Sequence, residues 1–240
     1  MIKVWDYLRE YELLRDDILN AVDDVFKNGT LIFGPKLDEF ETKFSSYHDS
    51  KYGIGVGNCT DAITIALKAL DIGPGDEVVM ADTNWIATAS PIVHLGAKPI
   101  FVDILPDSWC IDPDKVEAAI TPKTKWLILN SPNNPTGSAY TREELAALGA
   151  VLERHPHVWI MTDDMYEHLV YDGFEFTTIA QVTPSLYERT LTMNGVSKAY
   201  AMTGWRLGVT TGPPALISKM GLLLQPKAIL LSRLHQHSKL

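Results

Sequence analysis

The chain has 240 residues, of which 46% are hydrophobic and 21% are charged. This composition is ordinary for a globular protein, and the length suffices for one large α/β domain with a sizeable core. The formal net charge of −9 argues against a nucleic-acid or anionic-membrane partner, because no basic surplus is present to pair with phosphates.

Other simple features narrow the class of protein further. Cys59 and Cys110 are the only cysteines, too few for a disulfide framework or a cysteine metal site. The seven histidines include no HExxH pair, which argues against a metal enzyme. The first residues lack the charged and apolar regions of a signal peptide, and no apolar run approaches bilayer length. These features favour a soluble, cytoplasmic protein.

The chain begins with helical patterns and then alternates strands with helices. Apolar residues recur at helical spacing over Tyr11–Phe26, and Pro35–Tyr47 has the pattern of a shorter helix. Short apolar runs then predict seven strands, at Tyr52–Val56, Glu77–Met80, Pro99–Val102, Trp126–Leu129, Val158–Met161, Thr190–Met193 and Leu207–Thr210. Four further helices are expected between them, at Thr60–Leu70, Trp85–Leu95, Asp114–Ile120 and Arg142–Glu153. This alternation predicts a mostly parallel seven-stranded sheet with helices on both faces.

Chemically distinctive segments follow four of the expected strands. They are Gly55–Ala62, Asn130–Gly137, Thr162–Tyr166 and Asn194–Arg206. Each taken alone has an ordinary explanation as a helix start, a loop or a surface lysine. Because an open α/β sheet binds ligands at the carboxyl ends of its strands, we expect all four segments at one edge.

Together these segments supply what pyridoxal 5′-phosphate (PLP) requires. Its aldehyde needs a lysine amine for a Schiff base, and its pyridine nitrogen needs a carboxylate partner. Its phosphate needs an arginine and the free N–H groups of a helix start. The set therefore predicts a PLP site, with Lys198 as the residue that holds the cofactor.

The same segments resemble two families of aminotransferase. Residues 1 to about 125 resemble the DegT-type sugar-nucleotide aminotransferases, through Phe33-Gly34-Pro35, Gly55-Val56-Gly57-Asn58, Thr60-Asp61-Ala62 and Gly96-Ala97-Lys98-Pro99. Residues from about 120 to 213 resemble bacterial class I aspartate aminotransferase, through Asn130–Gly137, Asp163–His168 and Val196–Gly208. Both families share the large domain of the fold type I PLP transferases, so the resemblance implies that α/β fold in a chimera-like chain.

The resemblance assigns roles around the cofactor ring. Lys198 resembles the Schiff-base lysine and proton shuttle, and Asp163 resembles the partner of the pyridine nitrogen. Tyr166 and Asn134 resemble the groups that hydrogen-bond the phenolic oxygen of the ring. Trp85 lies where both families place an aromatic ring over the pyridine face, the alternative being a plain core tryptophan.

A second group of residues is assigned to the phosphate. Arg206 resembles the phosphate-binding arginine, with Ser197 nearby. Thr60 and Asp61 match the phosphate loop of the sugar-nucleotide enzymes, in which the usual glycine is replaced here by Cys59. No residue is assigned to a metal.

The resemblance also suggests a domain division. Residues 1–30 are expected to form a helical arm, 31–213 the PLP-binding large domain and 214–240 an atypical C-terminal tail. No sequence matches the small C-terminal domain that carries the carboxylate-binding arginine of class I enzymes. The chain is therefore expected to be C-terminally truncated relative to them.

Three functions remain open from the sequence. The leading hypothesis is an aminotransferase that moves an amino group from a small-molecule donor to an oxo acceptor, of the aspartate and 2-oxoglutarate type or with an oxo-sugar nucleotide. The second is an inactive truncated scaffold that binds PLP or only dimerises. The third is a phosphate-binding α/β module without catalysis. Fold type I sites normally form between two subunits, so the resemblance implies a homodimer.

Overall fold

A computed structural model describes residues 6–224 of the chain. The chain divides into two compact units between Phe40 and Glu41, later than the boundary at residue 30 suggested by the sequence. The first unit contains helix α1 (Tyr7–Asn28), which has no buried residue and ends at Gly29 in the left-handed conformation that glycine favours. Helix α2 (Pro35–Tyr47) begins in the first unit and ends in the second.

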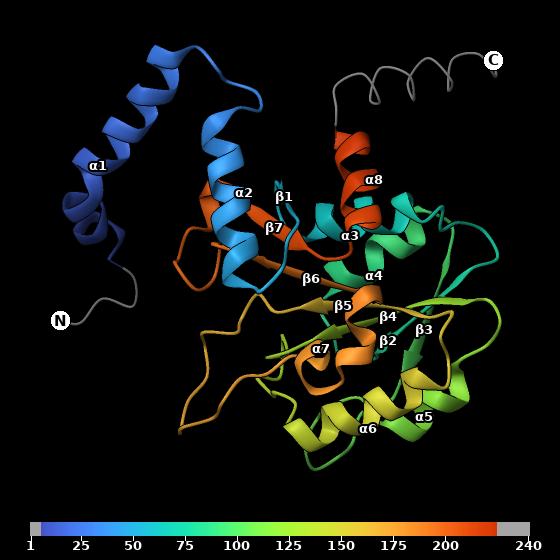
Figure 1. The fold of residues 1–240 in the computed structure, drawn as a ribbon. Coiled ribbons are helices and arrows are strands. Elements are labelled where there is room, and N and C mark those ends of the chain that lie inside the picture. The colour runs from blue at the N-terminus through green and yellow to red at the C-terminus, as the bar shows by residue number, and fades with distance from the viewer. Residues whose placement is uncertain (1–5, 225–240) are drawn as a thin grey trace. The chain divides into compact units, whose positions relative to one another are not determined.

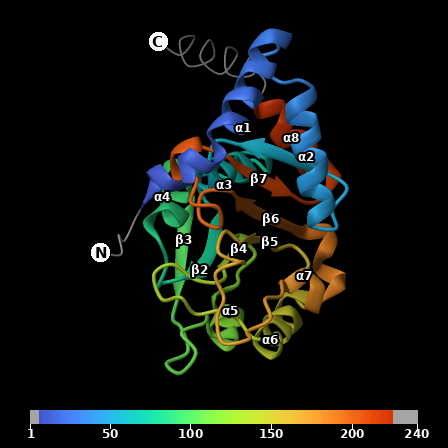
Figure 2. The same ribbon diagram turned by 90° about the vertical axis from the view of Figure 1, so that its left-hand side faces the viewer.

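The second unit is built on one seven-stranded sheet. Its strands are β1 (Gly53–Val56), β2 (Glu77–Ala81), β3 (Lys98–Val102), β4 (Thr124–Asn130), β5 (Trp159–Asp163), β6 (Thr190–Gly195) and β7 (Gly208–Thr211). They lie in the order β1-β7-β6-β5-β4-β2-β3, and all seven are labelled in Figure 1. Figure 2 shows the part of this order from β7 to β3 from another side. Within the described residues, four of the six strand pairings are parallel, and β7 is antiparallel to both of its neighbours. The predicted mostly parallel sheet is confirmed.

Strand β4 shows how this sheet is buried on both faces. Trp126 and Ile128 pack in the core on one side, and Leu127 and Leu129 pack in the core on the other side. Successive side chains of a strand point to opposite faces, so the middle of a central strand with helices on both sides is apolar at consecutive positions. This is why β4 is recognisable in the sequence as a continuous apolar run.

Helices cover both faces of the sheet (Figure 1). Helices α3 (Cys59–Ala69), α4 (Ile86–His94) and α8 (Pro214–Leu224) supply the core on one face. Helices α5 (Pro113–Ala119), α6 (Arg142–Glu153) and α7 (Ile179–Val182) lie on the other face. All four helices predicted between the strands are confirmed within one residue at each end.

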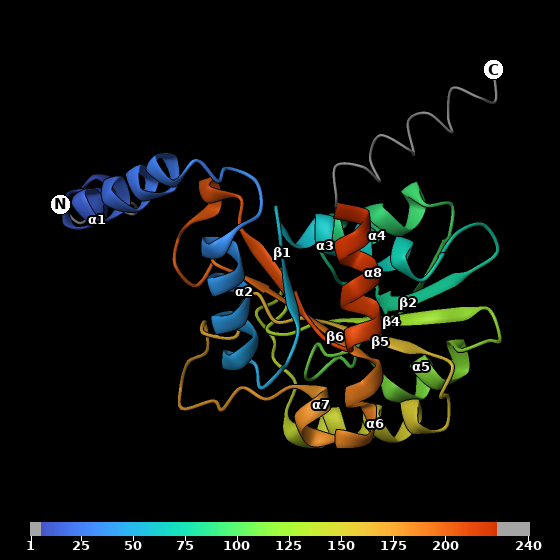
Figure 3. The same cartoon turned by 45° about the horizontal axis from the view of Figure 1, so that its top comes forward.

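Helix α8 differs from the expectation for the C-terminal tail. The sequence places residues 214–224 in that tail, but they form a helix that packs beside α3 (Figure 3). Leu216, Ile217 and Met220 are buried there in the core. Burial of these apolar side chains places α8 within the large unit. The rest of the expected tail, residues 225–240, lies outside the described residues.

The register of the sheet aligns the ends of its central parallel strands. Asn130, the last residue of β4, pairs with Asp163, the last residue of β5, and Asp163 pairs with Met193 of β6. The segments that leave these strands therefore begin at the same edge. Two short 3-10 helices, Pro184–Arg189 and Thr203–Trp205, lie in the connections around β6.

Among residues 6–224 there is no helix with the length and apolar character needed to cross a membrane.

Candidate functional site

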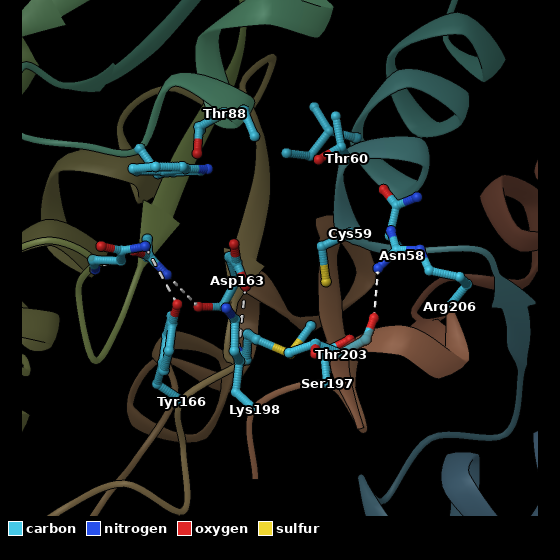
Figure 4. A pocket seen from close by; sticks show the side chains of 16 residues that line it. Asn58, Cys59, Thr60, Thr88, Asp163, Tyr166, Ser197, Lys198, Thr203 and Arg206 are labelled. Atoms are coloured by element: carbon cyan, nitrogen blue, oxygen red, sulfur yellow. Dashed lines mark hydrogen bonds between the residues drawn. The ribbon is translucent and has the colours of Figure 1, made fainter. Parts of the chain in front are cut away.

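A cleft of about 420 Å³ opens at this carboxyl edge of the sheet (Figure 4). Eight of the nine predicted site residues line it: Thr60, Trp85, Asn134, Asp163, Tyr166, Ser197, Lys198 and Arg206. They come from the start of α3, the N-cap of α4, the end of β5 and the segments after β4, β5 and β6. The fold therefore gathers residues from distant parts of the sequence around one space.

The segment after β4 is folded back against β5 by one asparagine. The Asn130 side chain accepts a hydrogen bond from the Asn134 N–H at 2.9 Å and donates one to the Asp163 carbonyl oxygen at 3.1 Å. Asn130 is buried at the end of its strand, so both bonds are shielded from water. They fix the backbone from which the Asn134 side chain reaches the cleft. The Asn134–Pro135 peptide bond is cis.

Asp163 is a half-buried carboxyl group at the end of β5. Burial raises its pKa from 3.8 to about 6, against the opposing effects of the Met165 N–H and the positive charge of Lys198. The Met165 N–H donates to Asp163 Oδ1 at 3.3 Å. The carboxyl group is therefore ionised above about pH 6 and lies near the cation of Lys198.

Lys198, Tyr166 and Asn134 form a chain of contacts beside Asp163. The Asn134 side-chain amide donates to the Tyr166 hydroxyl at 3.3 Å. Lys198 Nζ lies 5.8 Å from the centre of the Tyr166 ring, within the range of a cation–π contact. Figure 4 shows Lys198 and Tyr166 entering the cleft close to Asp163. An amine, a carboxyl group and a phenol thus face the same space.

The start of α3 forms a second wall of the cleft. Asn58 is the N-cap of this helix, and its side chain accepts the Asp61 N–H at 2.9 Å. The N–H groups of Cys59 and Thr60 lie in the same first turn, where an α-helix offers no acceptor of its own. Free N–H groups and the helix dipole make this end of α3 attractive to an anion.

Asp61 was predicted to bind the cofactor but does not line the cleft. Its carboxylate instead accepts a hydrogen bond from the Asn58 side-chain amide at 2.7 Å. The reciprocal pair of bonds between these two residues stabilises the turn that leads into α3. Asp61 therefore supports the loop from outside the cleft.

Arg206 and Ser197 line the cleft near the start of α3. Arg206 adopts the left-handed conformation, with φ of 55°, and its guanidinium donates to the Thr203 carbonyl oxygen at 2.9 Å. This bond uses one of the five N–H donors that an arginine carries. The remaining donors are available to an anion placed between Arg206 and the first turn of α3.

Trp85 forms an exposed part of the wall. It is the N-cap residue of α4 and is 56% exposed, in contrast to Trp126, which is fully buried in the core. A half-exposed indole in a cleft is available to stack on a flat ligand. Stacking on a cofactor ring remains a prediction, but Trp85 is not a core tryptophan.

Further lining residues were not identified from the sequence as site residues. They are Asn58, Cys59, Ile63, Ala87, Thr88, Asn130, Met165 and Thr203. Several lie inside the motifs that first marked the site, so proximity to a predicted residue was the available signal. Thr88 lies three residues after Trp85 in α4, and helical periodicity would have placed it near the same face.

Comparisons with known proteins identify the family of this chain. Residues 12–150 match the model of the DegT/DnrJ/EryC1/StrS aminotransferase family. The chain is 51% identical over 183 residues to the aspartate/prephenate aminotransferase of Cereibacter sphaeroides, covering 75% of this chain and 46% of that protein. It is 48% identical over 215 residues to the aspartate/prephenate aminotransferase of Nitrosomonas europaea, covering 86% of this chain and 54% of the relative.

Solved structures give the same result. The aspartate aminotransferase of Rhizobium meliloti superposes with a TM-score of 0.78 at 39% identity, covering 87% of this chain and 55% of that chain. The aspartate aminotransferase of Thermus thermophilus with maleate superposes with a TM-score of 0.75 at 32% identity, covering 87% and 56%. The fold is therefore that of the fold type I aminotransferases.

The comparisons cover only part of the relatives and of this chain. The chain spans about half the length of the curated relatives and solved structures described above. The family match extends to residue 150, past the position near 125 where the sequence resemblance was expected to change. Because this match covers more than half of the 240 residues, the chain belongs to the DegT/DnrJ/EryC1/StrS aminotransferase family.

Proposed function

We propose that the protein is a PLP-dependent aminotransferase that moves an amino group from aspartate, or a similar amino acid, to a 2-oxo acid. One observation carries the proposal. Lys198, Asp163 and the hydrogen-bonded pair of Asn134 and Tyr166 all line one cleft at the carboxyl edge of the sheet.

The groups in the cleft fit PLP by their chemistry. A primary amine, a half-buried carboxyl group and a phenol lie at one end, and an arginine and a helix start lie at the other end. These two ends match the ring and the phosphate of the cofactor. When bound, PLP supplies an electron sink for charge that develops on the α-carbon of the amino acid.

The ring end of the cleft provides proton chemistry. Lys198 Nζ would hold the cofactor through its aldehyde carbon and, when free of it, would act as the base that carries the α-carbon proton of the substrate. The Asp163 carboxylate would keep a proton on the pyridine nitrogen. The phenol of Tyr166 and the amide of Asn134 would donate hydrogen bonds to the phenolic oxygen of the ring. Trp85 would cover one face and exclude water.

The opposite end of the cleft provides an anion site. Arg206 and the hydroxyls of Ser197 and Thr60 can donate hydrogen bonds to a phosphate at the first turn of α3. The dipole of α3 adds favourable electrostatics at the same point. These residues would fix the orientation of the cofactor relative to Lys198.

The relatives support aspartate as the amino donor, since those described above are named aspartate or aspartate/prephenate aminotransferases. A second candidate function, with an oxo-sugar nucleotide as acceptor, is supported by the family match over residues 12–150. Assays of both acceptors with one shared donor separate the two. Turnover with 2-oxoglutarate alone would support the first function, and turnover with the oxo-sugar nucleotide alone the second. A homodimer is also proposed, and light scattering would test it.

Visible absorbance of the purified chain with PLP tests the cofactor proposal. We expect a protein-bound band that is absent in Lys198→Ala and present in Lys219→Ala, which changes an exposed lysine of α8. Absence of the band in the unaltered chain, or its persistence in Lys198→Ala, would contradict the proposal. A normal band without transamination of either acceptor would indicate a PLP-binding scaffold without turnover.

A further inference from the structure

One buried asparagine connects the separate segments that carry the cleft residues. Asn194 is the second-last residue of β6, is 4% exposed, and lies shortly before Lys198 in the chain. Its side chain does not line the cleft. The Asn194 amide nitrogen donates to Glu167 Oε1 at 2.7 Å and is 3.2 Å from His48 Nε2. The amide oxygen accepts the Gly195 N–H at 2.7 Å.

These bonds define the orientation of the amide and the form of His48. Because the amide oxygen accepts from Gly195, the NH₂ group faces both Glu167 and His48. The other ring nitrogen of His48, Nδ1, is 3.1 Å from the Phe44 carbonyl oxygen and donates to it. In the tautomer with its proton on Nδ1, His48 accepts the Asn194 amide at Nε2.

Of the partners of Asn194, Cys59 lines the cleft and Glu167 adjoins a residue that does. Glu167 directly follows Tyr166, and its N–H donates to the Asp164 carbonyl oxygen at 3.0 Å. The Asn194 backbone carbonyl oxygen is 3.7 Å from the sulfur of Cys59, the first residue of α3. Burial, together with the negative charges of Asp163 and Asp164, raises the pKa of the Cys59 thiol well above its usual value, so the thiol remains a donor.

Gly195 shows that the packing behind Lys198 is tight. A Cβ atom at this position would lie 2.9 Å from the Leu207 carbonyl oxygen, closer than real Cβ contacts. The glycine allows the end of β6 to approach the segment before β7. A shift of Asn194 would therefore be passed to the backbone that leads to Lys198.

We propose that Asn194 is a positioning residue, which holds the Tyr166, Lys198 and α3 walls of the cleft in register through its bonds to Glu167, Gly195 and Cys59. The inference rests on the proposed PLP function for its cofactor readout. Asn194 touches neither the cleft nor its contents, so it acts through other residues.

The contact between Asn194 and Glu167 requires an amide at position 194. Glu167 is 12% exposed at its side chain and faces His48 at 3.9 Å and His168 at 3.4 Å. An aspartate at position 194 would have the size of asparagine, but it would place a carboxylate 2.7 Å from that of Glu167 and remove the donor to His48. A glutamine at position 167 keeps an acceptor for Asn194.

Four variants test this arrangement. They are Asn194→Asp, Glu167→Gln, the double variant of both, and Asn28→Asp as a matched control. Asn28 also donates to a carboxylate, that of Asp24 at 3.1 Å, but on an exposed helix of the other unit. In the double variant the amide introduced by Glu167→Gln can donate to the new carboxylate, which restores one bond without changing the size of either side chain.

The first readout is the dissociation constant for PLP, measured by the visible band that depends on Lys198. Loss of a hydrogen bond to a charged group corresponds to about a tenfold change or more, so we expect Asn194→Asp to bind PLP about tenfold more weakly. Glu167→Gln and Asn28→Asp should stay near the unaltered value, and the double variant should recover most of the loss. An unchanged constant in Asn194→Asp, or no recovery in the double variant, overturns the proposal.

The second readout does not require PLP. Amide hydrogen exchange of the chain without cofactor should be about tenfold faster in Asn194→Asp at both 164–169 and 195–198, and slower again in the double variant. Faster exchange at 195–198 alone would show a local effect of the substitution and would overturn the proposal. If the unaltered chain shows no Lys198-dependent band but this exchange pattern appears, the PLP function fails and the positioning role stands.

Discussion

The side-chain amide of Asn134 donates a hydrogen bond to the Tyr166 hydroxyl at 3.3 Å, across 32 positions of sequence. The contact joins the segment after β4 to the segment after β5, beside the amine of Lys198. It orients two polar groups toward the same point in the cleft. This is the arrangement expected if both donate to one oxygen of a bound ligand.

Coupling between these two residues can be measured with a double-mutant cycle. We expect Tyr166→Phe and Asn134→Ala each to weaken PLP binding about fivefold, because each removes one hydrogen bond worth about 1 kcal/mol. The double variant should lose less than the sum, since the two groups contact each other. Tyr171→Phe, at a tyrosine that is 75% exposed, is the control. If the losses of PLP affinity in the two single variants add fully, the contact between Asn134 and Tyr166 has no coupling free energy.

The half-buried carboxyl group of Asp163, whose pKa is raised, should reduce stability at neutral pH. Its folded pKa of about 6 exceeds the ordinary 3.8, so the folded chain binds the proton more tightly than the unfolded chain. Stability from this group is therefore present below pH 3.8 and is lost as the pH rises through 6.

An asparagine at this position avoids that loss. We expect Asp163→Asn to raise the free energy of unfolding by up to roughly 3 kcal/mol at about pH 8, with little change at about pH 4. Urea unfolding at the two pH values measures the difference. Asp107→Asn, at an exposed position, should show no such pH dependence. If Asp163→Asn raised the free energy of unfolding more in acid than at neutral pH, the raised pKa of Asp163 would be contradicted.

Arg206 should contribute to the binding of the phosphate of the cofactor but not to the binding of its ring. We expect Arg206→Ala to weaken PLP binding about tenfold or more, because charge-assisted hydrogen bonds to phosphate are among the strongest. Binding of pyridoxal, which lacks the phosphate, should be unchanged. Fluorescence titration with both compounds measures the two constants, and Arg142→Ala, an exposed arginine at the start of α6, is the control. Equal losses for both compounds would place Arg206 away from the phosphate.

Helix α8 should contribute to the stability of the large unit. Leu216 is 1% exposed and packs in the core, whereas Leu222 on the same helix is 58% exposed. We expect Leu216→Ala to cost about 2–4 kcal/mol of unfolding free energy and Leu222→Ala less than about 0.5 kcal/mol. Chemical denaturation provides the measurement. Equal small effects would mean that residues 214–224 behave as the tail expected from the sequence.

Much of the sheet could be predicted because the burial of each strand produces an apolar run in the sequence of that strand. Strands such as β4, covered on both faces, are apolar over their middle residues, so each is visible as a short hydrophobic run. The cleft could be predicted because parallel strands end at one edge, and the adjacency of β4, β5 and β6 then brings Asn134, Asp163 and Lys198 together.

Other features depended on long-range packing. Helix α8 has an apolar sequence in which no local pattern shows that α3 covers it. Asp61 follows the motif of a phosphate loop, yet its carboxylate pairs with Asn58 because the turn before α3 needs both of their bonds. Local motifs identify the kinds of residue at a site but do not choose between competing partners.

The sequence by itself determined the fold class and the gathering of Asn134, Asp163 and Lys198 at one edge of the sheet, because apolar periodicity and motif spacing are local properties of the chain. Only the tertiary structure decided that Asn194 lies between His48 and Glu167, since His48 is 146 positions away. That contact depends on sheet order and strand register, which arise from the packing of the whole domain rather than from any single segment.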